Sequence, residues 1–144
     1  METRTVGRTL VKARITNLND LLNVKAGTLK PEQVRSIEVE DALVDAGAKL
    51  ISMPKRLIAQ LGLQHFDTRP ATTAVGNVPS NLYHSVRLEV HGRECVSDVA
   101  EVADTCPVLI GYIPLELMCY IVDPVSQRVI PSPEHGGQEV IELY

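Results

Sequence analysis

Aromatic residues are scarce in this sequence, which contains no tryptophan, one phenylalanine and four tyrosines among 144 residues. Proteins that bind single-stranded nucleic acid stack the bases on aromatic side chains interleaved with basic residues, and no such pattern is present. The net charge of −4 also argues against the basic face that binds nucleic acid or an anionic membrane. We therefore expect no nucleic-acid partner.

Long apolar runs are also missing. No run approaches the roughly 18 residues needed to span a bilayer, and Met1–Leu10 lacks the charged-then-apolar pattern of a signal peptide. We expect a cytoplasmic protein with no membrane association.

The sequence has only three cysteines, Cys95, Cys106 and Cys119, and no two of them form a C-x-x-C motif. This pattern favours buried, reduced thiols in a cytosolic protein. His91 lies four residues before Cys95, but no second pair of ligands is nearby, and a zinc site needs three or four ligands. We expect no metal and no cofactor, and a metal or redox protein built on the cysteines is the least supported function.

The apolar residues that are present follow strand-like patterns. At 44% hydrophobic and 22% charged residues, the chain suits one domain with a sizeable core. We expect residues 1–33 to form an N-terminal strand and a long connection, and residues 34–144 to form the core. The predicted class is mainly β, with a closed or partly open barrel. Strands are expected in residues 8–16, 34–44, 49–52, 83–102 (two strands around a turn at residues 91–92), 107–111, 123–130 (a turn followed by a strand) and 138–144.

One short α-helix is predicted in "MPKRLIAQLG", residues 53–62. Pro54 suits the first turn, and Gly62 suits the position that ends a helix. Residues 113–120 have room for one or two further helical turns. Residues 64–73 are expected to be irregular or edge-like because they contain a proline, and residues 72–83 suit an exposed hairpin or loop.

The most informative stretch is "ALVDAGAKL", in which three apolar residues precede Asp45 and a predicted turn with Gly47 and Ala48 follows it. Asp-x-Gly turns are common structural devices. A buried unpaired carboxylate is costly, however, so if the strand carries Asp45 into the interior, the carboxylate must be paired or protonated. An apolar-apolar-Gly sequence recurs at Leu109–Gly111, just before a short helical segment. The two motifs together favour a site built around Asp45.

In order and spacing, these motifs resemble the retropepsin-like aspartic proteases, single-domain relatives of retroviral proteases that also occur in bacteria. The resemblance covers most of the chain from Val34 onward and includes the glycine hairpin around Gly76. It implies an acid-protease barrel that hydrolyses extended peptide or protein substrates with no metal or cofactor. It assigns catalysis to Asp45, substrate binding to Gly47, Ala48, Val75, Gly76 and Asn77, and support of the catalytic pair to Ala46, Leu109, Ile110 and Gly111.

Aspartic proteolysis needs two carboxyl groups that share a proton, and the chain contains one apolar-Asp-x-Gly-Ala element. Counting therefore predicts a homodimer in which each copy supplies Asp45. Lys49 either favours the ionised form of Asp45 or points to solvent.

Ala46 stands where the family has threonine or serine, whose hydroxyl group bonds across the catalytic pair to the partner's backbone. Losing one such hydrogen bond costs on the order of 1 kcal/mol, so a weaker dimer and a looser pair are expected. An active natural variant, a natural pseudo-enzyme and a laboratory substitution all remain open. The alternative function is a non-catalytic dimeric module that binds peptides or a partner.

Overall fold

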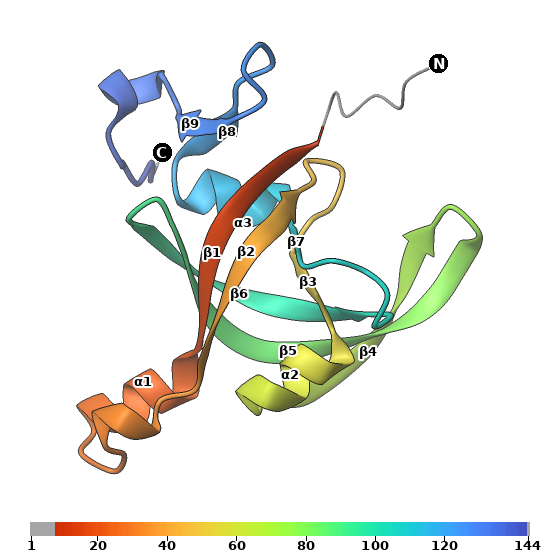
Figure 1. Cartoon of the computed structure of the whole chain (residues 1–144), viewed down its shortest axis with the longest axis vertical. Coiled ribbons are helices and arrows are strands. Elements are labelled where there is room, and N and C mark those ends of the chain that lie inside the picture. Colours follow the sequence, from red (N-terminus) through yellow and green to blue (C-terminus); the bar gives the residue numbers. More distant parts are fainter. Residues whose placement is uncertain (1–7, 144) are drawn as a thin grey trace.

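A computed structural model of the chain (Figure 1) describes residues 8–143, and it is mainly β, as the sequence predicts. The strands are β1 (Thr9–Asn17), β2 (Ser36–Val44), β3 (Ile51–Pro54), β4 (Gln64–Thr73), β5 (Gly76–Val90), β6 (Arg93–Val102), β7 (Leu109–Ile110), β8 (Tyr120–Val122) and β9 (Val129–Pro131). The α-helices are α1 (Leu18–Lys25), α2 (Lys55–Leu61) and α3 (Tyr112–Leu117). Short 3-10 turns occupy Pro31–Gln33 and Glu134–Gly137.

Seven of the strands form one sheet, in the order β1-β2-β7-β3-β6-β5-β4. Strand β1 also pairs with β5, so the hydrogen-bonded ladder closes into a ring of six strands that leaves β4 at the edge. The apolar residues that alternate along these strands meet inside, where Ile15, Ile51, Leu88 and Ile110 are fully buried. Strands β8 and β9 form a separate two-stranded sheet near the C-terminus (Figure 1).

Helix α2 begins and ends close to the predicted positions. Pro54 is its N-cap, and Gly62 ends it with a φ of 66°, in the left-handed region that favours glycine. The described residues contain three α-helices where one short α-helix was predicted. Helix α3 overlaps residues 113–120, which have room for helical turns, whereas α1 was not predicted. Helix α1 lies in the segment expected to be a connection, and it begins because the Asn17 side chain accepts a hydrogen bond from the Asp20 N–H group at 3.0 Å.

Residues 64–73, expected to be irregular or edge-like, form β4, the edge strand of the sheet, and its pairing with β5 is irregular between His65 and Asp67. One strand prediction needs correction. Residues 138–143 form no strand, although their apolar residues alternate. A strand needs a partner for its backbone groups, and this segment pairs with no other strand within residues 8–143. The hairpin expected around residues 72–83 and the turn at residues 91–92 are both present.

None of the helices in residues 8–143 combines the length and the apolar character needed to cross a bilayer.

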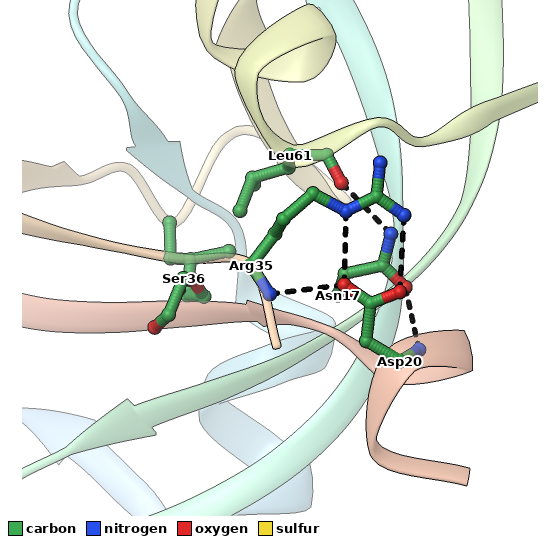
Figure 2. A network of polar contacts seen from close by, with 6 residues as sticks. Asn17, Asp20, Arg35, Ser36 and Leu61 are labelled. Carbon is green, nitrogen blue, oxygen red and sulfur yellow. Dashed lines mark hydrogen bonds and ion pairs between the residues drawn. The ribbon is translucent and has the colours of Figure 1, made fainter. Parts of the chain in front are cut away.

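A polar network fastens the N-terminal part of the chain to the rest (Figure 2). The Asp20 carboxylate accepts hydrogen bonds from Nε and Nη2 of Arg35, at 2.9 and 3.0 Å, and from the Arg35 backbone N–H group at 2.9 Å. The Asn17 side-chain amide donates to the Leu61 carbonyl at 2.8 Å. The network thereby joins α1, the start of β2 and the end of α2.

This network makes the stability of the protein depend on pH. Hydrogen bonds from the Arg35 guanidinium lower the pKa of Asp20 from its ordinary value of 3.8. Because the folded pKa lies below the unfolded one, the stabilisation is present above about pH 4 and is lost as the pH falls through the folded pKa. We expect the free energy of unfolding to fall more steeply below about pH 4 in the wild type than in Asp20→Asn.

Urea denaturation across this pH range measures the difference, because the other carboxyl groups titrate in both proteins and their contribution cancels. Identical slopes in the two proteins would show that Asp20 does not contribute in this way.

Candidate active site

The candidate site is built where a short strand inserts between two others. Strands β2 and β3 are consecutive in the chain, yet they do not pair with each other, because β7 lies between them. Strand β7 runs parallel to β2, with Val44 opposite Ile110, and antiparallel to β3, with Ile51 opposite Ile110. The connection between β2 and β3, residues 45–50, therefore lies beside the end of β7. We call residues 45–50 the Asp45 loop.

Backbone hydrogen bonds fix the position of Asp45. Its N–H group donates to the Ile110 carbonyl at 2.9 Å, and its carbonyl accepts from the Ala48 N–H group at 3.1 Å. Its carboxylate atom Oδ1 accepts from the Gly47 N–H group at 2.9 Å. The residue before it, Val44, is buried, whereas Asp45 is exposed in the single chain. The loop thus holds a carboxylate at the surface, on the end of a buried strand.

Gly111 allows the Asp45 loop and β7 to approach this closely. Its N–H group donates to the Leu50 carbonyl at 2.9 Å. A Cβ atom at this position would lie 2.6 Å from the Leu50 carbonyl oxygen and 2.7 Å from that of Ala48. Backbone atoms of the loop therefore occupy the space that any other side chain needs.

The first turn of α3 completes the support of the loop. The N–H group of Tyr112 donates to the Ala48 carbonyl at 2.9 Å, and that of Ile113 donates to the Lys49 carbonyl at 3.2 Å. Sequence reasoning did not identify these two residues. The sequence signal that could have found them is Gly111 directly before a helix. The first N–H groups of a helix have no acceptor within the helix, so they need acceptors elsewhere.

The structure brings together two of the three predicted groups of site residues. Asp45, Ala46, Gly47 and Ala48 lie beside Leu109, Ile110 and Gly111. Ile110 contributes only its backbone carbonyl to the site, since its side chain is fully buried in the core and cannot contact a substrate. The Ala48 N–H and C=O groups are already used inside the chain, whereas the Gly47 carbonyl accepts no hydrogen bond within residues 8–143.

The third group, Val75, Gly76 and Asn77, lies at the tip of the β4–β5 hairpin, which projects from the sheet (Figure 1). The side chain of Val75 is 89% exposed. The tip is held by its own contacts, because the Thr73 hydroxyl group donates to the Gly76 carbonyl at 2.7 Å. Within the described part of the chain, no hydrogen bond joins this tip to the Asp45 loop.

The Asp45 carboxylate has no cationic partner among the described residues. Within residues 8–143, none of the ion pairs includes Asp45 or Lys49, and Lys49 is exposed. Asp45 lines neither the cavity of about 580 Å³ at the C-terminal end nor the one of about 450 Å³ beside the β4–β5 hairpin. The Asp45 carboxylate is therefore open to solvent and is held by the Gly47 N–H group.

The residues best placed to hold a metal ion lie elsewhere. Glu134, His135 and Glu142 have ligand atoms within 4.8 Å of one another, and all three are exposed. The imidazole of His135 already contacts the Glu142 carboxylate at 2.8 Å. None of them belongs to the Asp45 loop or to its support.

Comparison with known proteins adds no family to these observations, since no protein-family model and no curated protein matches the chain. The geometry of the site is therefore the basis for a functional assignment.

Proposed function

We propose that the protein is a homodimeric aspartic endopeptidase of the retropepsin-like class, in which Asp45 from each of two chains forms the catalytic pair. The observation that carries this proposal is the insertion of β7 between β2 and β3. It holds Asp45 by its backbone and leaves the carboxylate exposed at the end of a buried strand. An exposed, positioned carboxylate at such a junction suits acid–base chemistry rather than the stabilisation of the core.

The proposed mechanism uses the two carboxyl groups in opposite protonation states. Two carboxylates close together do not both ionise, so the pair shares one proton. The ionised Asp45 takes a proton from a water molecule, whose oxygen attacks the peptide carbonyl carbon. The protonated Asp45 of the other copy donates its proton to the carbonyl oxygen. The tetrahedral intermediate then breaks its C–N bond as the departing nitrogen receives a proton from the pair.

The backbone near Asp45 suits an extended substrate. The Gly47 carbonyl accepts no hydrogen bond within residues 8–143, so it is free to accept one from the N–H group of a bound peptide. The β4–β5 hairpin is proposed to act as the flap that closes over the substrate and excludes water. Val75, at its tip, then presents an apolar side chain to the peptide.

Cleavage of an unstructured polypeptide tests the proposal. We expect the wild-type protein to cleave it in an acidic to neutral range of pH, and Asp45→Asn to be slower by at least about 100-fold. The amide oxygen of the substituted side chain can still accept the Gly47 N–H group, so the variant is expected to keep its fold. Product analysis measures the cleavage rates from about pH 3 to about pH 8. The Asp45 pair is expected to lose its shared proton within this range.

Two results would argue against this function. Equal cleavage by Asp45→Asn would point to a contaminating protease. A monomeric protein at micromolar concentration, by sedimentation, would leave Asp45 without its partner.

Restoring a hydroxyl group at position 46 provides a second prediction. Ala46 is exposed in the single chain, so a threonine fits without disturbing the core. If the hydroxyl bonds to the partner's backbone, Ala46→Thr gains about 1 kcal/mol from each of two symmetric hydrogen bonds. We expect a tighter dimer by sedimentation and faster cleavage. Ala46→Val is the matched control, because it adds similar volume without the hydroxyl group and is expected to produce neither gain.

A non-catalytic dimer that binds peptides is the second candidate, and Ala46 is the observation that favours it. In that case the wild type and Asp45→Asn bind an extended peptide equally well, and neither cleaves it. Measuring peptide binding and cleavage on the same two proteins separates the candidates.

A further inference from the structure

A cavity of about 580 Å³ lies at the C-terminal end of the molecule, between α3, β8 and the segment that follows β9 (Figure 1). We call it the C-terminal cavity. Its apolar lining comes from Ile113, Leu117, Ile121, Val140 and Ile141. Four of these side chains are open to solvent, and the most exposed are Leu117, at 55%, and Ile141, at 85%. No residue of the Asp45 loop lines the cavity.

The polar part of the lining carries charge of one sign. Glu116, Glu134 and Glu142 line the cavity, and no lysine or arginine does. His135 also lines it and contacts the Glu142 carboxylate at 2.8 Å, so Glu116 and Glu134 are the carboxylates with no such contact. The neighbouring cation, Arg93, is engaged by backbone carbonyls and by the Glu139 carboxylate, at 3.8 Å. It donates to the Gly137 carbonyl at 2.6 Å and to the Met118 carbonyl at 3.1 Å. The cavity is therefore an apolar surface with an acidic rim.

This charge pattern decides between two kinds of occupant. A second copy that docked symmetrically on this face would bring the same three carboxylates of both copies together, and like charges across an interface are unfavourable. An occupant with Lys or Arg beside an apolar residue satisfies both parts of the lining. Strand β8, whose Tyr120 and Ile121 line the cavity, pairs within residues 8–143 only with β9. Its other edge pairs with no strand there, and an unpaired strand edge is what an extended peptide adds to.

We propose that the C-terminal cavity binds an extended polypeptide segment in which an apolar side chain is flanked by lysine or arginine. The apolar side chain packs against Leu117 and Ile121, and the flanking cations face Glu116 and Glu134. Ile113 lines the cavity and also supports the Asp45 loop, but Asp45 itself does not line the cavity. Binding does not depend on cleavage and is expected to be the same in Asp45→Asn.

Two fluorescein-labelled peptides test the proposal on the full-length Asp45→Asn protein. One carries a leucine flanked by lysines in a Gly/Ser background, and the other has glutamates in place of the lysines. By fluorescence anisotropy, the basic peptide is expected to bind at least about 10-fold more tightly, and added salt is expected to reduce the difference. The variant Glu116→Lys/Glu134→Lys is expected to prefer the acidic peptide instead.

The matched control is Glu32→Lys/Asp41→Lys, which changes the net charge equally at exposed positions outside the cavity. It is expected to keep the wild-type preference, and Leu117→Ser is expected to weaken binding of the basic peptide. Loss of the preference in the control would show a general charge effect and overturn the proposal. Failure of the wild type to bind either peptide would overturn it as well. So would a dimer that dissociates in Leu117→Ser, because a second copy would then cover the cavity.

Discussion

Replacing Gly111 by alanine is expected to lower the free energy of unfolding by about 3 kcal/mol or more, which is a large part of the stability of a small domain. Gly111 has a φ of −82°, a value that any residue adopts. The cost therefore comes from space and not from backbone conformation. The added methyl group would lie 2.6 Å from the Leu50 carbonyl oxygen, and a backbone atom cannot move aside as the end of a flexible side chain can.

The clash of the added methyl group is with backbone atoms of the Asp45 loop, so it is relieved by separation of β7 from that loop. The Gly111–Leu50 hydrogen bond would then lengthen, and with it those from Tyr112 and Ile113 to the loop. We therefore expect Gly111→Ala to lose any activity that depends on Asp45 even at temperatures where most of the protein remains folded. Urea denaturation measures the stability, and amide hydrogen exchange at Tyr112 and Ile113 measures the opening of the loop.

Gly47→Ala is the control for this prediction because it lies in the same loop. A Cβ atom at Gly47 would meet only the Asp45 Oδ1 atom, at 3.2 Å, and that atom belongs to an exposed side chain that can rotate. Its effect on stability is expected to be well below that of Gly111→Ala. Equal effects would show that the loop is sensitive to any added methyl group, and that the approach of β7 is not the cause.

Replacing Asp20 by alanine is expected to lower the free energy of unfolding by about 2 kcal/mol. The side chain of Asp20 is only 6% exposed and accepts three hydrogen bonds from Arg35. The substitution leaves the Arg35 backbone N–H group without its acceptor. Because the Arg35 side chain is 50% exposed, water can solvate the guanidinium, which keeps the cost below that of a fully buried pair.

An exposed pair of the same chemistry serves as the control. Asp67 and Arg69 are in contact at 2.7 Å, but both side chains are more exposed than the Asp20 carboxylate. Surface pairs of this kind contribute little, so Asp67→Ala is expected to change stability much less than Asp20→Ala. A double-mutant cycle with Arg35→Met then measures the coupling of Asp20 to the guanidinium, and a coupling near zero would contradict the role given to the network.

The parts of the site that were predictable from the sequence depend on local patterns. The apolar run before Asp45 marks a buried strand, and the Asp-x-Gly turn marks its end. The repeat of this pattern at Leu109–Gly111 marks a second strand with a glycine stop. Strand-forming tendency and turn chemistry are both encoded within a few neighbouring residues, so these elements were found close to their true positions.

The parts that were not predictable depend on contacts between distant residues. Nothing local in Leu109 and Ile110 indicates that they insert between β2 and β3. The capping bond from Asp20 to Asn17 is local, but the contact between Asp20 and Arg35, which fixes α1 to the core, is not. The alternation of Val140 with its neighbours predicts a strand, yet a strand forms only where a partner edge is available, and none pairs with it in residues 8–143.

The insertion of β7 also sets the order in which the protein can mature during synthesis. A nascent chain that ends before Leu109 can contain β1 to β6. It lacks the Ile110 carbonyl, which accepts a hydrogen bond from the Asp45 N–H group. It also lacks the N–H groups that donate to the carbonyls of Ala48, Lys49 and Leu50. The Asp45 loop can therefore take its final form only after Ile113 has left the ribosome. Incomplete or truncated chains carry Asp45 but not the arrangement that positions it.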